Sequence, residues 1–193
     1  MIAKNYFIYL EDSLQLARSY SNIGSCFFRL KQIDQAMRYF NESLKISRAI
    51  RDKRGEVRAN LNIGILFMNN NNFRTADSLF QKAYQYLVDK EDTLGIAIVC
   101  SNMADLFYRQ KNYDKALVFV NKSLDLLNNE PGIVVAEAHT LISKICLAQG
   151  KVQESEYQAD ISLKMARKIE SKMLIYDALL QLVEVYGNRR DFE

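Results

Sequence analysis

The sequence is poor in proline, glycine, histidine and cysteine. It has one proline, one histidine, three cysteines and seven glycines. With so little proline and glycine and no long polar tract, disorder and flexible linkers are not expected. No apolar run approaches the roughly 18 residues that a membrane-spanning helix needs, and no signal peptide is present. We therefore expect no membrane insertion within this chain.

The chemistry of an enzyme is also missing. A single histidine excludes a His pair for a metal ion or a proton relay. The sequence contains no Gly-rich phosphate loop, no Gly-x-Ser-x-Gly and no Cys-x-x-Cys. We expect no catalytic residue, no metal site and no cofactor. His139 falls on an inward-facing stripe, where we expect a packed core histidine.

The three cysteines, Cys26, Cys100 and Cys146, match no metal-ligand spacing and cannot all pair with one another. We predict that all three lie on inward-packing helix faces as small buried hydrophobic residues. Nothing therefore indicates an oxidising compartment. A soluble, cytoplasmic location is favoured, and an extracytoplasmic sensor segment is the alternative.

The charge is nearly balanced. There are 26 basic and 23 acidic residues, for a net charge of +3, which does not by itself indicate a nucleic-acid partner. The densest basic run, residues 45–58, also holds Asp52 and Glu56, so we interpret it as a solvated surface. Nucleic-acid binding through this run is the alternative, and it would require a steep salt dependence.

One stretch occurs three times at intervals of about 40 residues, which indicates a supersecondary unit stacked on copies of itself. We number each copy so that Gly24 is position 8. Positions 4, 7, 8 and 11 then share one stripe of a first helix, and positions 20, 24 and 27 share the stripe of a second helix. Short polar connections make the two helices an antiparallel hairpin. In the first copy these stripes are Tyr20, Ile23, Gly24 and Phe27, then Ala36, Phe40 and Ser43.

The copies extend through the chain. A weaker fourth copy places Ser143, Cys146, Ser155 and Ala159 at positions 8, 11, 20 and 24. A fifth begins with Leu179, Leu182, Val183 and Tyr186 and leaves an uncovered apolar stripe. We assign repeats to residues 13–53, 54–92, 93–130 and 131–170, with a partial repeat at 171–193.

The start of the chain has a repeat-like junction. Glu11-Asp-Ser-Leu14 matches Glu91-Asp-Thr-Leu94, which joins the second and third repeats. We therefore predict that residues 1–12 are the tail of a preceding second helix. Both ends look cut, so we expect a fragment of a longer protein rather than a complete one.

The pattern Ile23-Gly24, Phe27, Ala36 and Phe40 resembles the signature of the tetratricopeptide repeat. The usual period of that family is 34 residues, and helices longer by about a turn and a half would account for the difference. The long variety is similar to the repeats of kinesin light chains, Pins-type adaptors and bacterial peptide-responsive signalling regulators. The resemblance implies an all-α fold, a right-handed α-solenoid (superhelix) of antiparallel helical hairpins. It implies function only as a class.

In that family the side of the first helix opposite the packing stripe lines a concave groove, at positions 2, 6, 9 and 13. Position 6 is asparagine in three consecutive repeats, and an amide can pair with both backbone groups of an extended peptide. The alternative is that each Asn bonds a neighbouring helix or turn. The predicted groove residues are Arg18, Asn22, Ser25, Arg29, Arg58, Asn62, Asn69, Asn102, Asp105, Arg109 and Lys144.

The groove positions of the first three repeats are basic. Arg18, Arg29, Arg58 and Arg109 stand against Asp105 alone, which favours an acidic peptide or a C-terminal carboxylate. A mixed solvated surface is the alternative. The Lys-x-x-x-Asn pattern of carboxylate-clamp adaptors is absent from the first helix.

We therefore expect a module that binds an extended protein or peptide ligand in its concave groove, as the sensing or docking segment of a larger, bacterial signalling protein. The alternative is a structural spacer or self-association module that forms a homodimer through its repeat ends or its convex face.

Overall fold

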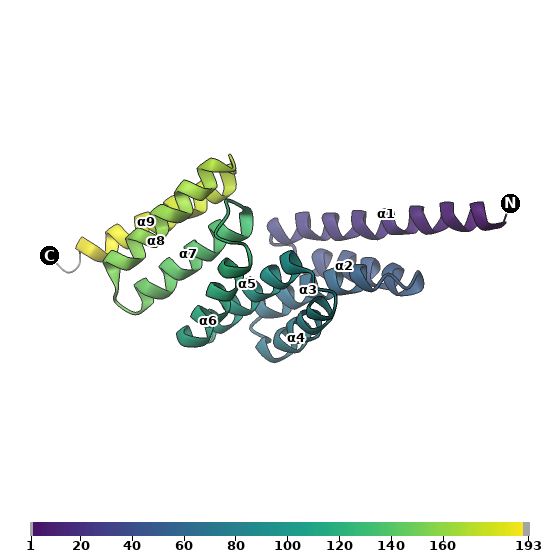
Figure 1. Ribbon diagram of the computed structural model, residues 1–193, viewed down its shortest axis with the longest axis horizontal. Helices are drawn as coiled ribbons and strands as arrows, with labels where there is room; N and C mark the ends of the chain where they lie inside the picture. The colour runs from purple at the N-terminus through teal and green to yellow at the C-terminus, as the bar shows by residue number, and fades with distance from the viewer. Residues whose placement is uncertain (1, 191–193) are drawn as a thin grey trace. The chain divides into compact units, whose positions relative to one another are not determined.

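The computed structural model describes the backbone of residues 2–190 and the side chains of residues 9–188 (Figure 1). Every regular element in this part of the chain is an α-helix. The all-α fold is therefore confirmed. The helices are α1 Ile2–Arg29, α2 Ile33–Ala49, α3 Lys53–Asn69, α4 Phe73–Asp89, α5 Thr93–Arg109, α6 Tyr113–Leu126, α7 Ile133–Ala148, α8 Val152–Lys168 and α9 Lys172–Arg190.

The helix lengths explain the repeat period. Five helices, α2, α3, α4, α5 and α8, have 17 residues each. Connections such as residues 50–52 and 70–72 join them. Two such helices with two such connections account for the spacing of about 40 residues.

Most of the connections share one geometry. The amide of Gln32 donates to the carbonyl of Phe27 at 2.9 Å, and the amide of Lys31 to that of Phe28 at 2.9 Å. This pair of bonds is the Schellman motif, whose penultimate residue is left-handed. Because most of these left-handed residues are not glycine, the chain needs few glycines. They are Lys31, Arg51, Asn71, Glu91, Lys111, Asn128, Asn129 and Glu170, together with Gly150.

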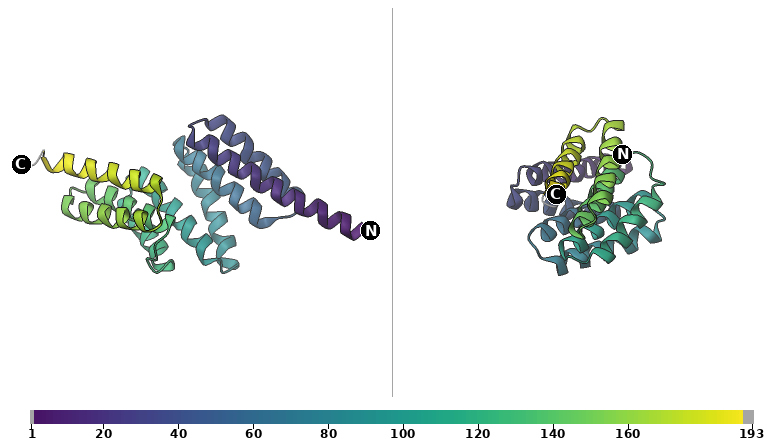
Figure 2. Two further views of the ribbon diagram at one scale, coloured as in Figure 1. Left: turned by 90° about the horizontal axis from the view of Figure 1, so that it is seen from above. Right: turned by 90° about the vertical axis from the view of Figure 1, so that its left-hand side faces the viewer.

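The helices divide into two compact units. Residues 1–89 hold α1–α4, and residues 90–193 hold α5–α9. Figures 1 and 2 show the order of the hairpins within each unit. Odd-numbered helices contact each other across hairpins: α1 with α3 in the first unit, and α7 with both α5 and α9 in the second. Among the described residues α2 does not contact α4, and α6 does not contact α8. Each unit therefore bends toward its odd-numbered helices.

The hairpin cores form where a small residue meets a large one. Gly24 lies under Phe40 and Gly64 under Phe80, and a Cβ added at either glycine would approach the facing ring carbon to 2.6 Å. Phe40 and Phe80 are buried. The predicted stripes thus supply much of each hairpin core, although Ile23 is 38% exposed on α1.

Helices α7 and α8 also form a packed hairpin. Ser143, Cys146, Ser155 and Ala159 are all buried. The hydroxyl of Ser155 donates to the carbonyl of Ser143, and that of Ser143 to the carbonyl of Ser155, each at 2.8 Å. Small polar residues here replace the apolar contact with reciprocal hydrogen bonds.

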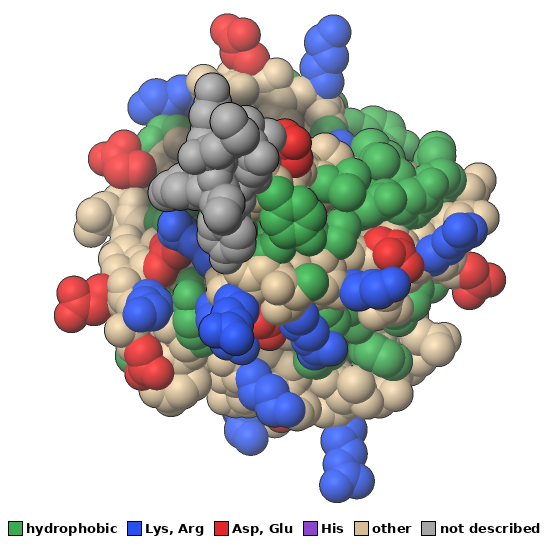
Figure 3. Space-filling model, turned by 90° about the vertical axis from the view of Figure 1, so that its right-hand side faces the viewer, with side chains coloured by type: hydrophobic (Ala, Val, Ile, Leu, Met, Phe, Trp, Pro, Cys, Tyr) green, Lys and Arg blue, Asp and Glu red, His purple; other side chains and the backbone are tan. Residues whose placement is uncertain are grey.

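The prediction for the cysteines was wrong at one position. Cys100 and Cys146 are buried, but Cys26 is exposed. Residues at the position of Cys26 in later repeats, such as Leu66 and Leu106, are buried. On α1 the side that carries Cys26 faces solvent. Figure 3 shows that hydrophobic side chains are also exposed on one face of the molecule. Cys26 is therefore a partly apolar surface residue rather than a core residue.

The predicted junction at residues 11–14 forms no turn, because α1 continues through it from Ile2 to Arg29. At two of the observed junctions between repeats, an aspartate caps the following helix. Asp52 accepts a hydrogen bond from the amide of Gly55 at 3.0 Å, and Asp92 from that of Gly95 at 2.9 Å. A Cβ at Gly55 would overlap the Asp52 carboxylate. After Asp12 the equivalent residue is Gln15 rather than glycine. The side chain of Gln15 would clash with an aspartate cap at residue 12.

Candidate functional site

All the predicted groove residues lie on odd-numbered helices, the inner side of each unit. Because the two units are separate bodies, the residues form two sets. The first unit holds seven, on α1 and α3, and the second holds four, on α5 and α7. The sets are Arg18, Asn22, Ser25, Arg29, Arg58, Asn62 and Asn69, and then Asn102, Asp105, Arg109 and Lys144.

The first unit brings two arginines together. Arg18 of α1 and Arg58 of α3 occupy the same repeat position on contacting helices. Burial lowers the pKa of Arg58, and the positive charge of Arg18 lowers it further, whereas Asp52 acts in the opposite direction. The two positive charges repel each other, so an anion bound between the two guanidinium groups would be stabilised.

The three asparagines have free amides. Among residues 9–188, none forms a hydrogen bond with the side chain of Asn22, Asn62 or Asn102. Asn22 is exposed, and the other two are half-buried. The alternative, in which each Asn bonds a neighbouring helix or turn, therefore has no support in the described structure. A half-buried amide without a partner is suited to bind a ligand.

Other predicted residues already have local partners. The hydroxyl of Ser25 donates to the carbonyl of Ser21 at 3.0 Å, and the amide of Asn69 to the carbonyl of Ile65 at 2.9 Å. Arg109 pairs with Asp105 at 3.0 Å along α5. The pair offsets the charge of Arg109, so the basic character is concentrated in the first unit. Lys144 and Arg29 are exposed.

The row of position-6 amides does not continue through the second unit. The fourth repeat has Leu141 at this position, and the fifth has Gln181. Both are buried, and Gln181 is only 2% exposed. Its amide has no hydrogen-bond partner among the described residues, so it cannot extend the row toward a ligand in the solvent.

Tyr108 on α5 is half-buried and interacts electrostatically with Asp105. Burial raises the pKa of Tyr108 on α5, and Tyr113, Glu184 and Asp105 raise it further. Its ring lies 6.0 Å from that of Tyr113. The equivalent residues in the other repeats, such as Phe28 and Met68, are apolar. A polar hydroxyl at a repeat position that is otherwise apolar is the sequence signal that could have identified Tyr108.

The single histidine is packed against the neighbouring helix. His139 is buried, and its Nδ1 lies 2.7 Å from Oε1 of Gln158, which confirms a packed histidine. No group of three or more His, Cys, Asp or Glu within residues 9–188 could hold a metal ion. No helix in the described part of the chain is long and apolar enough to cross a membrane.

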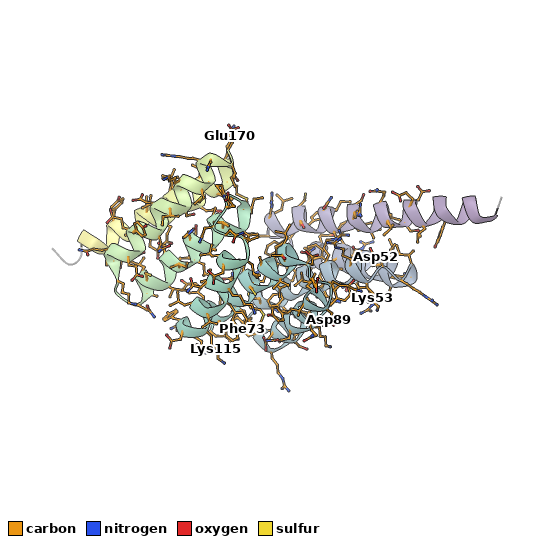
Figure 4. All side chains as sticks on the ribbon, viewed as in Figure 1. Asp52, Lys53, Phe73, Asp89, Lys115 and Glu170 are labelled. Atoms are coloured by element: carbon orange, nitrogen blue, oxygen red, sulfur yellow. The ribbon has the colours of Figure 1, made fainter. Side chains whose placement is uncertain are left out.

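The basic run at residues 45–58 contains ion pairs. Glu56 pairs with Lys53 at 3.0 Å and lies 3.8 Å from Arg48. Figure 4 shows Asp52 and Lys53 at the connection between α2 and α3. Its acidic residues thus offset part of its positive charge.

Stacked antiparallel hairpins with small residues at each crossing define the class, an α-helical repeat protein. Within that class, residues 17–50 match the family model of the tetratricopeptide repeat. Together with the solved structures below, this match supports a tetratricopeptide-repeat fold, a solenoid of helical hairpins.

One curated relative covers almost the whole chain. The 43 kDa receptor-associated protein of the synapse from Gallus gallus is 23% identical over 189 residues, which is 95% of this chain and 46% of the relative. The chain therefore spans about half the length of that protein.

Three solved structures are similar in fold. PilF of Pseudomonas aeruginosa has a TM-score of 0.63 at 18% identity, covering 94% of this chain and 72% of PilF. BtubC (BKLC) from P. vanneervenii has a TM-score of 0.62 at 18% identity, covering 81% and 65%. The Cut9–Hcn1 hetero-tetramer of the APC/C has a TM-score of 0.62 at 22% identity, covering 88% and 29%. At these identities the likeness shows the fold alone.

Proposed function

We propose that this chain binds an extended, acidic segment of a protein partner on the inner side of its first unit. The observation that carries the proposal is the constellation of Arg18 and Asn22 on α1 with Arg58 and Asn62 on α3. Each helix places a cation one turn before a free amide. The amides suit the backbone of an extended peptide, and the arginines suit its carboxylates.

We include Ser25, Arg29 and Asn69 as the rim of this surface in the first unit. These residues adjust charge and shape, whereas the free amides and the two arginines supply the main contacts. In the second unit, Asn102 with Asp105, Arg109 and Lys144 would form a surface of its own.

A binding role without catalysis agrees with what the related proteins are called. The chicken relative is named for its association with a receptor, and Cut9 is described in a complex with Hcn1. By analogy, this chain would act as a docking or sensing segment of a larger signalling protein. The resemblance of the sequence favours a bacterial source, and the similar proteins include both bacterial and animal ones.

The test uses a fluorescent acidic peptide with a free carboxyl terminus, and fluorescence anisotropy. Replacing Asn22 and Asn62 by Ala should weaken binding at least about tenfold, because each lost pair of hydrogen bonds costs about 1 kcal/mol or more. The matched control is Asn69→Ala, since its amide is already bonded to Ile65. Equal binding by all these variants would contradict the proposal.

A second arm tests charge. An otherwise identical peptide with Lys in place of its acidic residues should bind far more weakly. Binding of the acidic peptide should weaken as salt rises, because the arginines are largely at the surface. If the basic peptide bound equally well, the arginines would not be part of the site.

Self-association is the second candidate, favoured by a specific observation. Large apolar side chains are exposed on both terminal helices, among them Leu16 and Leu30 on the first hairpin, and Leu180 and Val183 on α9.

A further inference from the structure

The exposed face of α9 has the spacing of a coiled-coil seam. Met173, Tyr176, Leu180 and Val183 are 45%, 62%, 49% and 68% exposed. Their separations of three, four and three residues are those of alternating a and d positions in a heptad. An exposed apolar patch of this kind marks an interaction site.

This face differs from the same face on the other first helices. Position 1 is alanine in three earlier repeats, and there a second-helix hydroxyl bonds the alanine carbonyl. Ser43 bonds Ala17, Ser123 bonds Ala97 and Ser162 bonds Ala136, each at 2.8 Å. In the fifth repeat the residue is Tyr176.

Position 8 departs in the same direction. It is Gly, Gly, Ala and Ser in the first four repeats but Val183 in the fifth. A second helix of the usual kind crosses closely over small residues, so α9 does not fit one. It fits a helix held further away, with side chains interlocking as in a coiled coil.

We propose that α9 pairs in parallel with α9 of a second copy of this chain, through a seam of Met173, Tyr176, Leu180 and Val183. The charges beside the seam indicate the partner. Lys172 lies at the flanking position before the first seam residue, and Asp177 at the flanking position after the second. In a parallel pair these two positions face each other across the interface, so Lys172 of each copy meets Asp177 of the other.

The opposite orientation is disfavoured. An antiparallel pair would bring the flank that carries Asp177 and Glu184 against its own copy, and the carboxylates would repel. Neither residue, nor Lys172, forms an ion pair with another described residue. All three are exposed. This surface is separate from the inner face of the first unit, so the dimer goes beyond the proposed peptide site.

The first experiment is sedimentation equilibrium of the 193-residue chain over a concentration series. We expect a dimer, and Leu180→Lys should raise its dissociation constant at least about thirtyfold, as loss of an interface hot spot does. The matched control is Leu16→Lys on α1, because Leu16 is 47% exposed and Leu180 is 49% exposed. Circular dichroism checks that both variants keep their helices.

A strict monomer at every concentration would overturn the proposal. So would a dimer that Leu16→Lys disrupts and Leu180→Lys leaves intact. Leu180→Lys should not change binding of the acidic peptide, so failure of the dimer and failure of the peptide site are distinguishable.

The second experiment tests orientation. Lys172→Glu and Asp177→Lys should each weaken the dimer about fivefold, and the double variant should restore it. Val183→Cys in a Cys26→Ser background should form a disulfide with its own copy on oxidation, because a d position meets itself in a parallel pair. Failure of the double variant to restore the dimer, or of Val183→Cys to cross-link, would overturn the parallel arrangement.

Discussion

At the residue scale, the sizes of positions 8 and 24 vary inversely. Position 8 runs Gly, Gly, Ala, Ser through the first four repeats, while position 24 runs Phe, Phe, Val, Ala. The direct contacts of Gly24 with Phe40 and of Gly64 with Phe80 explain the relation. A larger side chain on one helix is matched by a smaller one on the other, so each helix crossing stays closely packed.

This trade predicts coupling in the second repeat. Gly64→Ala should lower the free energy of unfolding by about 1–3 kcal/mol, because its Cβ would lie 2.6 Å from Cε1 of Phe80. Phe80→Val alone should also destabilise, because it leaves a void. The double variant should be more stable than the sum predicts by about 1 kcal/mol, measured by urea denaturation. Additive effects would contradict the size relation.

The cysteines differ in reactivity. Burial raises the pKa of Cys100 and of Cys146, so both thiols stay protonated to higher pH than in the unfolded chain. Because the native state retains these protons, their contribution to stability is present below the unfolded pKa and is lost as pH rises through the folded one.

We therefore expect one reactive thiol in the native protein. Cys26 is exposed and should react with a colourless disulfide reagent at neutral pH, whereas Cys100 and Cys146 should react only after unfolding. Absorbance measured with and without denaturant gives the count, and Cys26→Ser should abolish the native reaction. A second thiol that reacts at the same rate would contradict the burial.

At the element scale, the left-handed residues of the connections hold conformational strain. Glu170 has φ 54° in the connection from α8 to α9, where Figure 4 shows it at the tip. Gly150 has φ 76° in the equivalent place between α7 and α8, with open space where a Cβ would lie. The two connections have the same left-handed conformation, but one uses glutamate and the other glycine at that position.

Exchanging those choices should have opposite effects. Glu170→Gly should raise the free energy of unfolding by up to about 1 kcal/mol, because glycine adopts a left-handed conformation without strain. Gly150→Ala should lower it by a similar amount, through strain alone. Thermal unfolding followed by circular dichroism measures both. A loss of stability in Glu170→Gly would show that its side chain contributes more than its backbone costs.

At the scale of the whole molecule, the repulsion between Arg18 and Arg58 lowers stability, while the same two charges favour binding of an acidic ligand. Arg18 and burial both lower the pKa of Arg58, so its positive charge is less stable in the folded protein than in the unfolded one. That destabilisation is present at every pH at which both arginines are protonated. A site kept at such a cost is typical of function.

Arg58→Gln should therefore raise the melting temperature and weaken binding of the acidic peptide. We expect a gain of at most about 1 kcal/mol, since solvent screens the exposed part of the side chain. High salt should reduce the difference in stability between wild type and variant. A variant that loses both stability and binding would assign Arg58 a structural role instead.

The repeat sequence by itself determined the hairpins, their spacing and the residues at each crossing. These features depend on contacts within one repeat, so a local pattern is sufficient to predict them. The sequence also placed all eleven predicted groove residues on first helices, because the angular positions around a helix follow from spacing alone. The continuous helix through residues 11–14 was not predicted. The comparison with residues 91–94 matched Asp12 to Asp92 but did not take into account that Gln15 replaces the glycine that follows the cap.

Only the tertiary structure decided which copies of an equivalent position are covered. Cys26 is exposed where Leu66 is buried, and Gln181 is buried where Asn22 is exposed. It also decided that Arg18 lies near Arg58, and that the face of α9 has no covering helix among the described residues. Burial and charge at these positions depend on which helix of another repeat packs alongside, and no pattern within a single repeat contains that information.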